Sequence, residues 1–152
     1  MSNSGKSLPD FRLAQVEDAA EITRLAAELG YPASVQDMAS RLATLLPLPE
    51  HFVVVAESGG ALLGWAAVEI RMQLVSGRKA ELMGLVVDAN ARRMGIGKAL
   101  VRATENWVRE QGFDKMTVRS SAARPESHPF YERLGYERSK TQHVYIKHFD
   151  DV

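Results

Sequence analysis

The sequence predicts one α+β (α/β) domain, in which a mixed, twisted sheet of six or seven strands packs with about four helices. Its length of 152 residues is that of one ordinary domain. Apolar residues recur at every second position in some segments and at every third or fourth in others, as expected of strands and helices. No internal repeat or linker divides the chain. We therefore expect a flexible tail over residues 1–9 and a single domain over residues 10–152.

The first predicted elements are a short strand, Phe11–Gln15, and two amphipathic helices over residues 18–29 and 34–46. Each helix begins with a side chain that can cap it and carries an acidic residue three positions later. Each stops at a glycine or a proline. The residues that mark these limits are Asp18, Glu21 and Gly30 for the first helix, and Ser34, Asp37 and Pro47 for the second.

A β-rich middle section follows, after which helices and strands alternate. Short turns containing serine and glycine separate the strand candidates His51–Glu57, Ala61–Leu74 and Lys79–Val87. The later candidates are a helix over Gly97–Gln111, a strand over Lys115–Ser120, a short helix over His128–Leu134 and one or two strands within Glu137–Phe149. This order is a meander followed by a strand–helix–strand crossover, which is typical of a mixed sheet.

The composition excludes several kinds of site. Nineteen basic residues balance nineteen acidic ones, so no general attraction to nucleic acid or to a membrane surface is expected. The absence of cysteine excludes disulfides, thiolate metal sites and cysteine nucleophiles. The four histidines have no metal-ligand spacing, and no apolar run reaches the roughly 18 residues of a membrane span. We expect a cytoplasmic protein without a metal, a nucleic-acid partner or a membrane partner.

The most informative segment lies between residues 85 and 100, where an apolar strand leads through a turn into a long helix. The turn reads Arg92-Arg93-Met94-Gly95-Ile96-Gly97. The first turn of a helix presents backbone N–H groups without helical partners at the positive end of the helix dipole, and it can bind phosphate. Glycine allows an anion to approach the backbone closely, and Lys98 adds positive charge to that of the two arginines.

Two well-known phosphate motifs do not fit this turn. The dinucleotide fingerprint requires glycine or alanine where this chain has Leu100. The nucleoside-triphosphate loop requires a glycine at Arg92 and a hydroxyl residue at Ala99. A nucleotide-phosphate hydrolase or kinase is therefore a weaker alternative, also because metal-binding carboxylates are missing. What remains is Arg-x-x-Gly-x-Gly at the start of a helix. Taken alone, this motif could also be no more than a tight strand-to-helix turn.

With this motif the chain resembles the GNAT superfamily of acetyl-CoA-dependent N-acetyltransferases. Their signature is Arg/Gln-x-x-Gly-x-Gly/Ala after a strand that ends like Leu-x-Val. The resemblance implies that backbone amides of residues 93–98 hold the coenzyme pyrophosphate, and that the end of the preceding strand pairs with the pantetheine arm. The cofactor-binding residues implied in this way are Leu85, Val86, Val87, Arg92, Arg93, Met94, Gly95, Ile96, Gly97 and Lys98.

The segment Ser127-His-Pro-Phe-Tyr-Glu-Arg-Leu-Gly-Tyr136 resembles the late signature of the same family. The resemblance implies that Tyr131 lies near the coenzyme sulfur and protonates the departing thiolate. A phenol with a pKa near 10 is protonated at neutral pH and can act as this acid. A buried aromatic residue with a satisfied hydroxyl is the structural alternative. Many relatives carry an asparagine that contacts the coenzyme seven residues earlier; this chain has Arg124 there, which we count as cofactor-binding.

Transfer to an amine also requires a base, because a protonated amine has no lone pair for attack. In several family members this base is a glutamate on the strand before the glycine turn, and the matching residue is Glu81. Its strand is otherwise apolar, so we expect burial to raise its pKa. By period two, Met83, Leu85 and Val87 should share its face of the sheet, unless a bulge intervenes. A carboxylate paired with a basic residue is the structural alternative.

The resemblance implies an N-acetyltransferase with a GNAT-like acyl-CoA N-acyltransferase fold. The enzyme would move an acetyl group from acetyl-CoA, its co-substrate, to a primary amine by direct attack in a ternary complex. We expect a small-molecule amine acceptor rather than a protein, and we consider a homodimer as the assembly. A non-catalytic acyl-CoA-binding or regulatory module with the same fold is the alternative of another class.

Overall fold

The computed structural model describes residues 9–119 and 127–150, and for Ser127 it describes only the backbone. These residues fall into two compact units, one reaching to Arg119 and the other starting at Ser120. Most of the expected tail, residues 1–8, lies outside the described residues. The prediction of a single domain over residues 10–152 stays a prediction.

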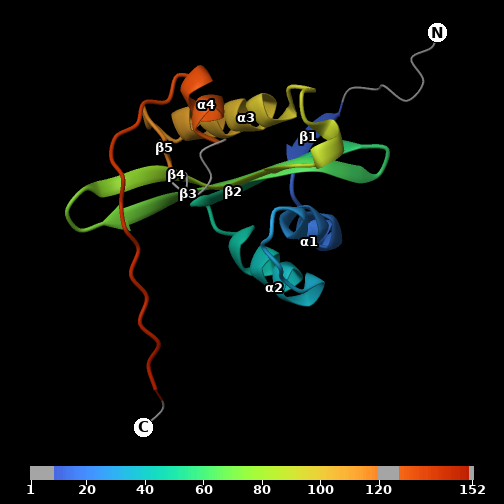
Figure 1. Cartoon of the computed structure of the whole chain (residues 1–152), viewed down its shortest axis with the longest axis horizontal. Helices are drawn as coiled ribbons and strands as arrows, with labels where there is room; N and C mark the ends of the chain where they lie inside the picture. The colour runs from blue at the N-terminus through green and yellow to red at the C-terminus, as the bar shows by residue number, and fades with distance from the viewer. Residues whose placement is uncertain (1–8, 120–126, 151–152) are drawn as a thin grey trace. The chain divides into compact units, whose positions relative to one another are not determined.

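The first unit is built on one sheet with strand order β1-β2-β3-β4-β5 (Figure 1). The strands are β1 (Asp10–Leu13), β2 (His51–Ser58), β3 (Ala61–Gln73), β4 (Gly77–Val87) and β5 (Thr117–Val118). Neighbours pair antiparallel except β4 and β5, which are parallel. The mixed sheet and the meander confirm the predicted fold class. The described residues contain five strands, however, rather than the predicted six or seven.

The predicted helices are present in the predicted order. They are α1 (Ala19–Glu28), α2 (Val35–Leu45), α3 (Ile96–Glu110) and α4 (Ser127–Arg133), with 3-10 turns η1 (Val16–Asp18) and η2 (Ala89–Ala91). Ser34 caps α2 as predicted, accepting the N–H of Asp37 at 2.9 Å. The predicted capping by Asp18 is wrong. Its carboxylate accepts the guanidinium of Arg12 and the N–H of Gln15 instead of capping α1, because a charged donor binds a carboxylate more strongly.

The helices of this unit cover both faces of the sheet, with α1 and α2 on one and α3 on the other (Figure 1). On the α1–α2 face, Leu25 and Leu42 join a buried cluster with Val53 and Val55 of β2. On the α3 face, Phe52 stacks on Trp107 with ring centroids 5.2 Å apart. The amphipathic faces predicted from apolar spacing are thus the faces that the sheet covers.

Gly64 of β3 sets how closely the first turn of α3 approaches the sheet. A Cβ atom at this position would lie 2.8 Å from the carbonyl oxygen of Val86 and 3.0 Å from a methyl group of Leu100. It would also lie 3.4 Å from a methyl group of Ile96, the first residue of α3. The absence of a side chain therefore places the N-terminus of α3 directly against the ends of β3 and β4.

We expect Gly64→Ala to lower the free energy of unfolding by about 1–3 kcal/mol, because the extra methyl group overpacks this contact. Urea denaturation measures the loss. Ala61→Val, at an exposed position on the same strand, serves as the control and should change stability by less than about 0.5 kcal/mol. Equal stability of Gly64→Ala and the wild type would show that α3 can move away from the sheet without a loss in the free energy of unfolding.

The second unit contains α4 and the residues that follow it. The helix ends in a glycine turn, in which Tyr136 donates its N–H to the carbonyl of Tyr131 at 3.1 Å and Gly135 has φ +95°. Residues 137–150 form no helix or strand, so the predicted strands within Glu137–Phe149 are wrong for the described chain. Their apolar residues pair with no strand edge: Val144, Tyr145, Ile146 and Phe149 are 79–89% exposed. None of the described helices is long and apolar enough to cross a membrane.

Candidate functional site

The turn between β4 and α3 has the backbone that the glycine motif predicts. Gly95 lies in the left-handed region, with φ +77° and ψ 11°, and α3 begins at the next residue. The first helical hydrogen bond runs from the N–H of Ala99 to the carbonyl of Gly95, at 3.0 Å. The N–H groups of residues 96–98 therefore precede the helical ladder and point out of the positive end of a 15-residue helix.

The space over this turn is open. Apart from Gly95 itself and its neighbours along the chain, no atom of the described residues lies within 4 Å of a Cβ built on Gly95. Arg92, Arg93 and Lys98 are all exposed around it. Arg93 also has φ +76°, which an L residue adopts at a cost of about 1–3 kcal/mol. A strained, positively charged loop beside unpaired N–H groups is suited to hold an anion such as a diphosphate.

Within residues 9–119, the strand that leads into the turn is paired along one edge and only partly along the other. On one side, Leu85, Val86 and Val87 pair with residues 64–66 of β3. On the other side, the described pairing of β4 with β5 covers Glu81 and Leu82 only. Among the described residues, the stretch 83–87 thus has no partner on its outer edge, and its backbone groups there can bind an extended amide chain. It includes Leu85–Val87, the residues that the family resemblance implies pair with the pantetheine arm.

A β-bulge at Met83 changes which residues share a face with Glu81. Ala67 of β3 faces Gly84, while the next residue, Val68, faces Leu82, so Met83 is an extra residue. Glu81 therefore lies on the same face as Gly84 and Val86. The prediction that Met83, Leu85 and Val87 share its face is wrong, because the bulge inverts the alternation after Leu82.

Glu81 is buried, with 1% of its surface exposed, and is paired with two arginines. Arg119 donates to its carboxylate at 3.1 and 3.3 Å, and Arg71 donates at 3.3 Å. Burial alone would raise the pKa of Glu81, but hydrogen bonds and charges from Arg119, and then from Arg71, outweigh it. The pKa therefore lies below its ordinary value of 4.5, and the predicted increase is wrong.

Sequence reasoning missed both arginines as partners of Glu81. Arg71 alternates with the apolar residues Ile70 and Met72 on β3, a pattern that by itself indicates only a strand with one polar face. Arg119 directly follows β5, and only the parallel pairing of β5 with β4 brings it to Glu81. A signal existed in the apolar surroundings of Glu81, because a buried carboxylate requires a partner.

Tyr131 lies on α4 in the second unit. Its ring packs edge-on against Phe130 and Tyr136, with centroids 5.1 and 6.0 Å away. Burial raises the pKa of its phenol above the ordinary value of 10, so the hydroxyl stays protonated at neutral pH. The structure thus groups the predicted residues 81–98 in the first unit and describes Tyr131 within the second, whereas Arg124 lies outside the described residues.

The described residues contain no group of three or more histidine, cysteine, aspartate or glutamate side chains that could hold a metal ion. The described residues of the first unit offer backbone amides, a positively charged turn and an ionised carboxylate, and those of the second unit offer a protonated phenol. These are groups that bind an anion, accept a proton and donate a proton.

Comparison with known proteins gives a consistent family. A family model described as "Acetyltransferase (GNAT) family" matches residues 16–136. Aminoglycoside N(6')-acetyltransferase type 1 of Klebsiella aerogenes is 33% identical over 113 residues, which cover 70% of this chain and 74% of that protein. N-acetyltransferase family 8 member 3 of Mus musculus is 29% identical over 112 residues, which cover 72% of this chain. The match spans only 50% of this mouse protein and 38% of the mouse protein described as probable N-acetyltransferase family 8 member 5.

Solved structures agree on the fold. Aminoglycoside N-acetyltransferase AAC(6')-Iy in complex with CoA superimposes with a TM-score of 0.84 at 21% identity, covering 97% of this chain and 99% of that chain. Glucosamine-6-phosphate N-acetyltransferase from Arabidopsis thaliana superimposes with a TM-score of 0.80 at 21% identity, covering 95% and 100%. At this identity the likeness confirms the fold that the sequence predicts.

Proposed function

The chain belongs to the acetyltransferase (GNAT) family, and from that premise we propose that it moves the acetyl group of acetyl-CoA to a primary amine of a small molecule. The observation that carries the proposal is the glycine turn, where open space over Gly95 meets the unpaired N–H groups of the first turn of α3. The part of β4 that no described strand pairs on its outer edge runs directly into this turn.

The residues of the first unit fit the two polar parts of coenzyme A. A diphosphate carries negative charge that the helix N-terminus and the exposed Arg92, Arg93 and Lys98 can balance. The amide-containing pantetheine arm can hydrogen-bond to the backbone of Leu85–Val87, as an added strand does. When bound, the coenzyme supplies an acetyl thioester, whose carbonyl carbon is open to attack by an amine.

In this proposal the amine nitrogen forms a bond to the acetyl carbon while the carbon–sulfur bond breaks. The ammonium first loses one proton to Glu81, because only the neutral amine has a lone pair for the attack. As the amide forms, its nitrogen loses a second proton, which replaces the proton that Tyr131 donates to the sulfur of the leaving thiolate. Because Glu81 is 1% exposed, we propose that the first proton reaches it through a water molecule. No covalent enzyme intermediate is required, which agrees with a chain without cysteine.

We infer the acceptor class from the names of similar proteins. These include proteins named as aminoglycoside, glucosamine-6-phosphate and mycothiol acetyltransferases. An amino group on a sugar or another small polar molecule is therefore the acceptor we propose. A lysine side chain or a peptide N-terminus is a less favoured acceptor.

The proposal is tested by following free-thiol release from acetyl-CoA across a panel of amines: aminoglycosides, amino sugars, polyamines and a lysine peptide. Thiol release with at least one small amine, and its loss without amine, supports the proposal. Calorimetric titration with coenzyme A distinguishes the enzyme from a non-catalytic module that binds the coenzyme. Tight coenzyme uptake without turnover across the panel would favour an acyl-CoA-binding module with the same fold.

We expect Glu81 to titrate below pH 4.5 in the folded protein, because its two arginines favour the charged form. A lowered folded-state pKa contributes stability above the ordinary value of 4.5, and this contribution is lost as the pH falls through the folded value. NMR titration with labelled glutamate carboxyl groups measures the pKa, with Glu81→Gln identifying the signal. Arg119→Gln should move this titration to higher pH, because burial raises the pKa of Glu81 and the charge of Arg119 then no longer lowers it. A wild-type titration near pH 6–7 would contradict the prediction.

A further inference from the structure

The loop that carries the glycine turn is fixed at its first residue, Asp88. The N–H of Asp88 donates to the carbonyl of Leu63 at 2.8 Å, where β4 leaves the sheet. Its carboxylate accepts the N–H of Asn90 at 2.8 Å, and its carbonyl accepts the N–H of Ala91 at 2.9 Å. Asp88 is 9% exposed, so these bonds are shielded from water. The course of the chain toward Arg92 therefore depends on the position of this one residue.

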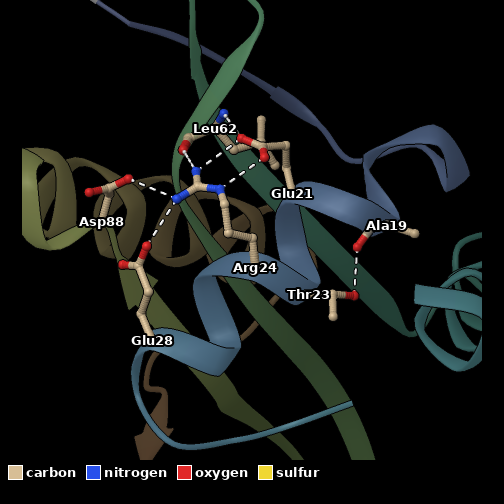
Figure 2. Close-up of polar contacts among 7 residues, drawn as sticks. All are labelled: Ala19, Glu21, Thr23, Arg24, Glu28, Leu62 and Asp88. Atoms are coloured by element: carbon tan, nitrogen blue, oxygen red, sulfur yellow. Dashed lines mark hydrogen bonds and ion pairs between the residues drawn. The ribbon is translucent and has the colours of Figure 1, made fainter. Parts of the chain in front are cut away.

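Arg24, a residue of α1, donates a hydrogen bond to the carboxylate of Asp88, as Figure 2 shows. One guanidinium donates to three carboxylates and one carbonyl: Asp88 at 3.2 Å, Glu28 at 3.0 Å, Glu21 at 2.9 and 3.0 Å, and Leu62 at 3.0 Å. Glu21 in turn accepts the N–H of Leu62 at 3.0 Å. The pair of Arg24 and Glu21 thus binds both backbone groups of a β3 residue that lies beyond the last residue paired with β4.

The charges of this group make the guanidinium more than a link between α1 and β3. Three carboxylates surround it, so the four side chains together carry a net negative charge, and one of them, Asp88, lies on the loop that leads to the turn. Without the guanidinium, the three carboxylates would repel each other, and the charge of Asp88 on this loop would no longer be balanced. Arg24 therefore holds Asp88 in place and neutralises part of the negative charge of the three carboxylates around it.

We propose that Arg24 is a positioning residue for coenzyme binding, which acts through Asp88 and Leu62 to hold the glycine turn in the conformation that receives the diphosphate. The proposal rests on the proposed function, because it assumes that acetyl-CoA is the donor. It concerns the diphosphate, because the hydrogen bonds of Arg24 reach Asp88 and Leu62 but none of the residues Leu85–Val87.

The chain offers a matched control in Arg12. This arginine donates to Asp18 at 2.9 Å, to Glu57 at 2.8 Å and to the carbonyl of Leu13 at 3.1 Å. Its side chain is 31% exposed, against 39% for Arg24. It ties β1 to β2 and to the start of α1, and none of its partners belongs to residues 88–98. Losing it removes a comparable set of ionic hydrogen bonds at a place unrelated to the turn.

The experiment compares Arg24→Gln, Asp88→Asn and Arg12→Gln in the full chain, with two acetyl donors. One donor is acetyl-CoA; the other is acetyl-pantetheine, which lacks the diphosphate and the nucleotide. We expect Arg24→Gln to raise the KM for acetyl-CoA, and the calorimetric Kd of coenzyme A, by about tenfold, as the loss of one charged hydrogen bond predicts. With acetyl-pantetheine its kcat/KM should equal that of the wild type. Asp88→Asn should show a smaller effect of the same kind.

Arg12→Gln should lower the melting temperature about as much as Arg24→Gln while its Kd for coenzyme A stays within about twofold of the wild-type value. Two results would overturn the proposal: an unchanged Kd in both Arg24→Gln and Asp88→Asn, or an equal loss with both donors. If Arg24→Gln does not fold, Asp88→Asn decides alone, because asparagine can still accept the N–H of Asn90. A wild-type chain that takes up no coenzyme A contradicts the proposed function itself.

Discussion

Replacing Gly95 with valine is expected to raise the Kd for coenzyme A by about 100-fold or more. The residue has φ +77°, which a β-branched side chain resists, and its side of the turn is open to the ligand. A valine there would move the following N–H groups and occupy the place of the diphosphate. Losing two charged hydrogen bonds of about 1.5–3 kcal/mol each accounts for the expected change. Calorimetric titration with coenzyme A measures it.

Gly112, just beyond α3, is the control for this substitution. It has φ +94°, and as at Gly95 an added Cβ would have no atom of the described residues within 4 Å apart from those of the glycine and its neighbours along the chain. Gly112→Val should therefore carry a similar backbone penalty of about 1–2 kcal/mol. Its coenzyme affinity should stay within about threefold of the wild-type value, because Gly112 follows the C-terminal end of α3 and the glycine turn precedes its N-terminal end. Equal affinities in Gly95→Val and the wild type would end the assignment of this turn to the diphosphate.

Local sequence rules predicted most of the first unit because its signals are local. The glycine turn is an example: a left-handed residue followed by a helix start requires only the neighbouring residues, and α3 begins at Ile96, one residue before the predicted Gly97. The meander strands likewise follow from alternation and turn residues. The capping role of Asp18 failed because Arg12, a residue outside the helix, competes for its carboxylate.

The errors at the candidate site have a common physical origin in long-range pairing. The pKa of Glu81 depends on Arg119, which is distant in sequence and adjacent only through the parallel pairing of β4 with β5. The bulge at Met83 is set by how β3 and β4 pair along their whole length, and a period-two pattern does not contain it. The segment after Tyr136 has the alternation that is typical of a strand. A strand also requires a neighbouring strand to pair with, and residues 137–150 pair with none of the described strands.

Replacing Tyr131 with phenylalanine is expected to lower kcat by about 100-fold to 1,000-fold with little change in the KM for acetyl-CoA. The substitution keeps the ring and its edge-on contacts with Phe130 and Tyr136 while it removes the only proton that the phenol can give. Positioned acids contribute about 100-fold to 10,000-fold to rates, which sets the scale of the loss. Steady-state thiol release with the best amine of the panel measures both constants.

Tyr136→Phe is the control, since it removes a hydroxyl from the neighbouring ring and should leave kcat within about threefold of the wild-type value. The pH profile adds a second check. Burial raises the pKa of Tyr131, so the required protonated form is lost only as the pH rises through a value above 10, and the wild-type rate should show no fall from this group below that pH. A kcat for Tyr131→Phe equal to that of the wild type would mean that the thiolate leaves without this acid. The hydroxyl would then serve packing alone, and the donor of the proton would have to be sought elsewhere.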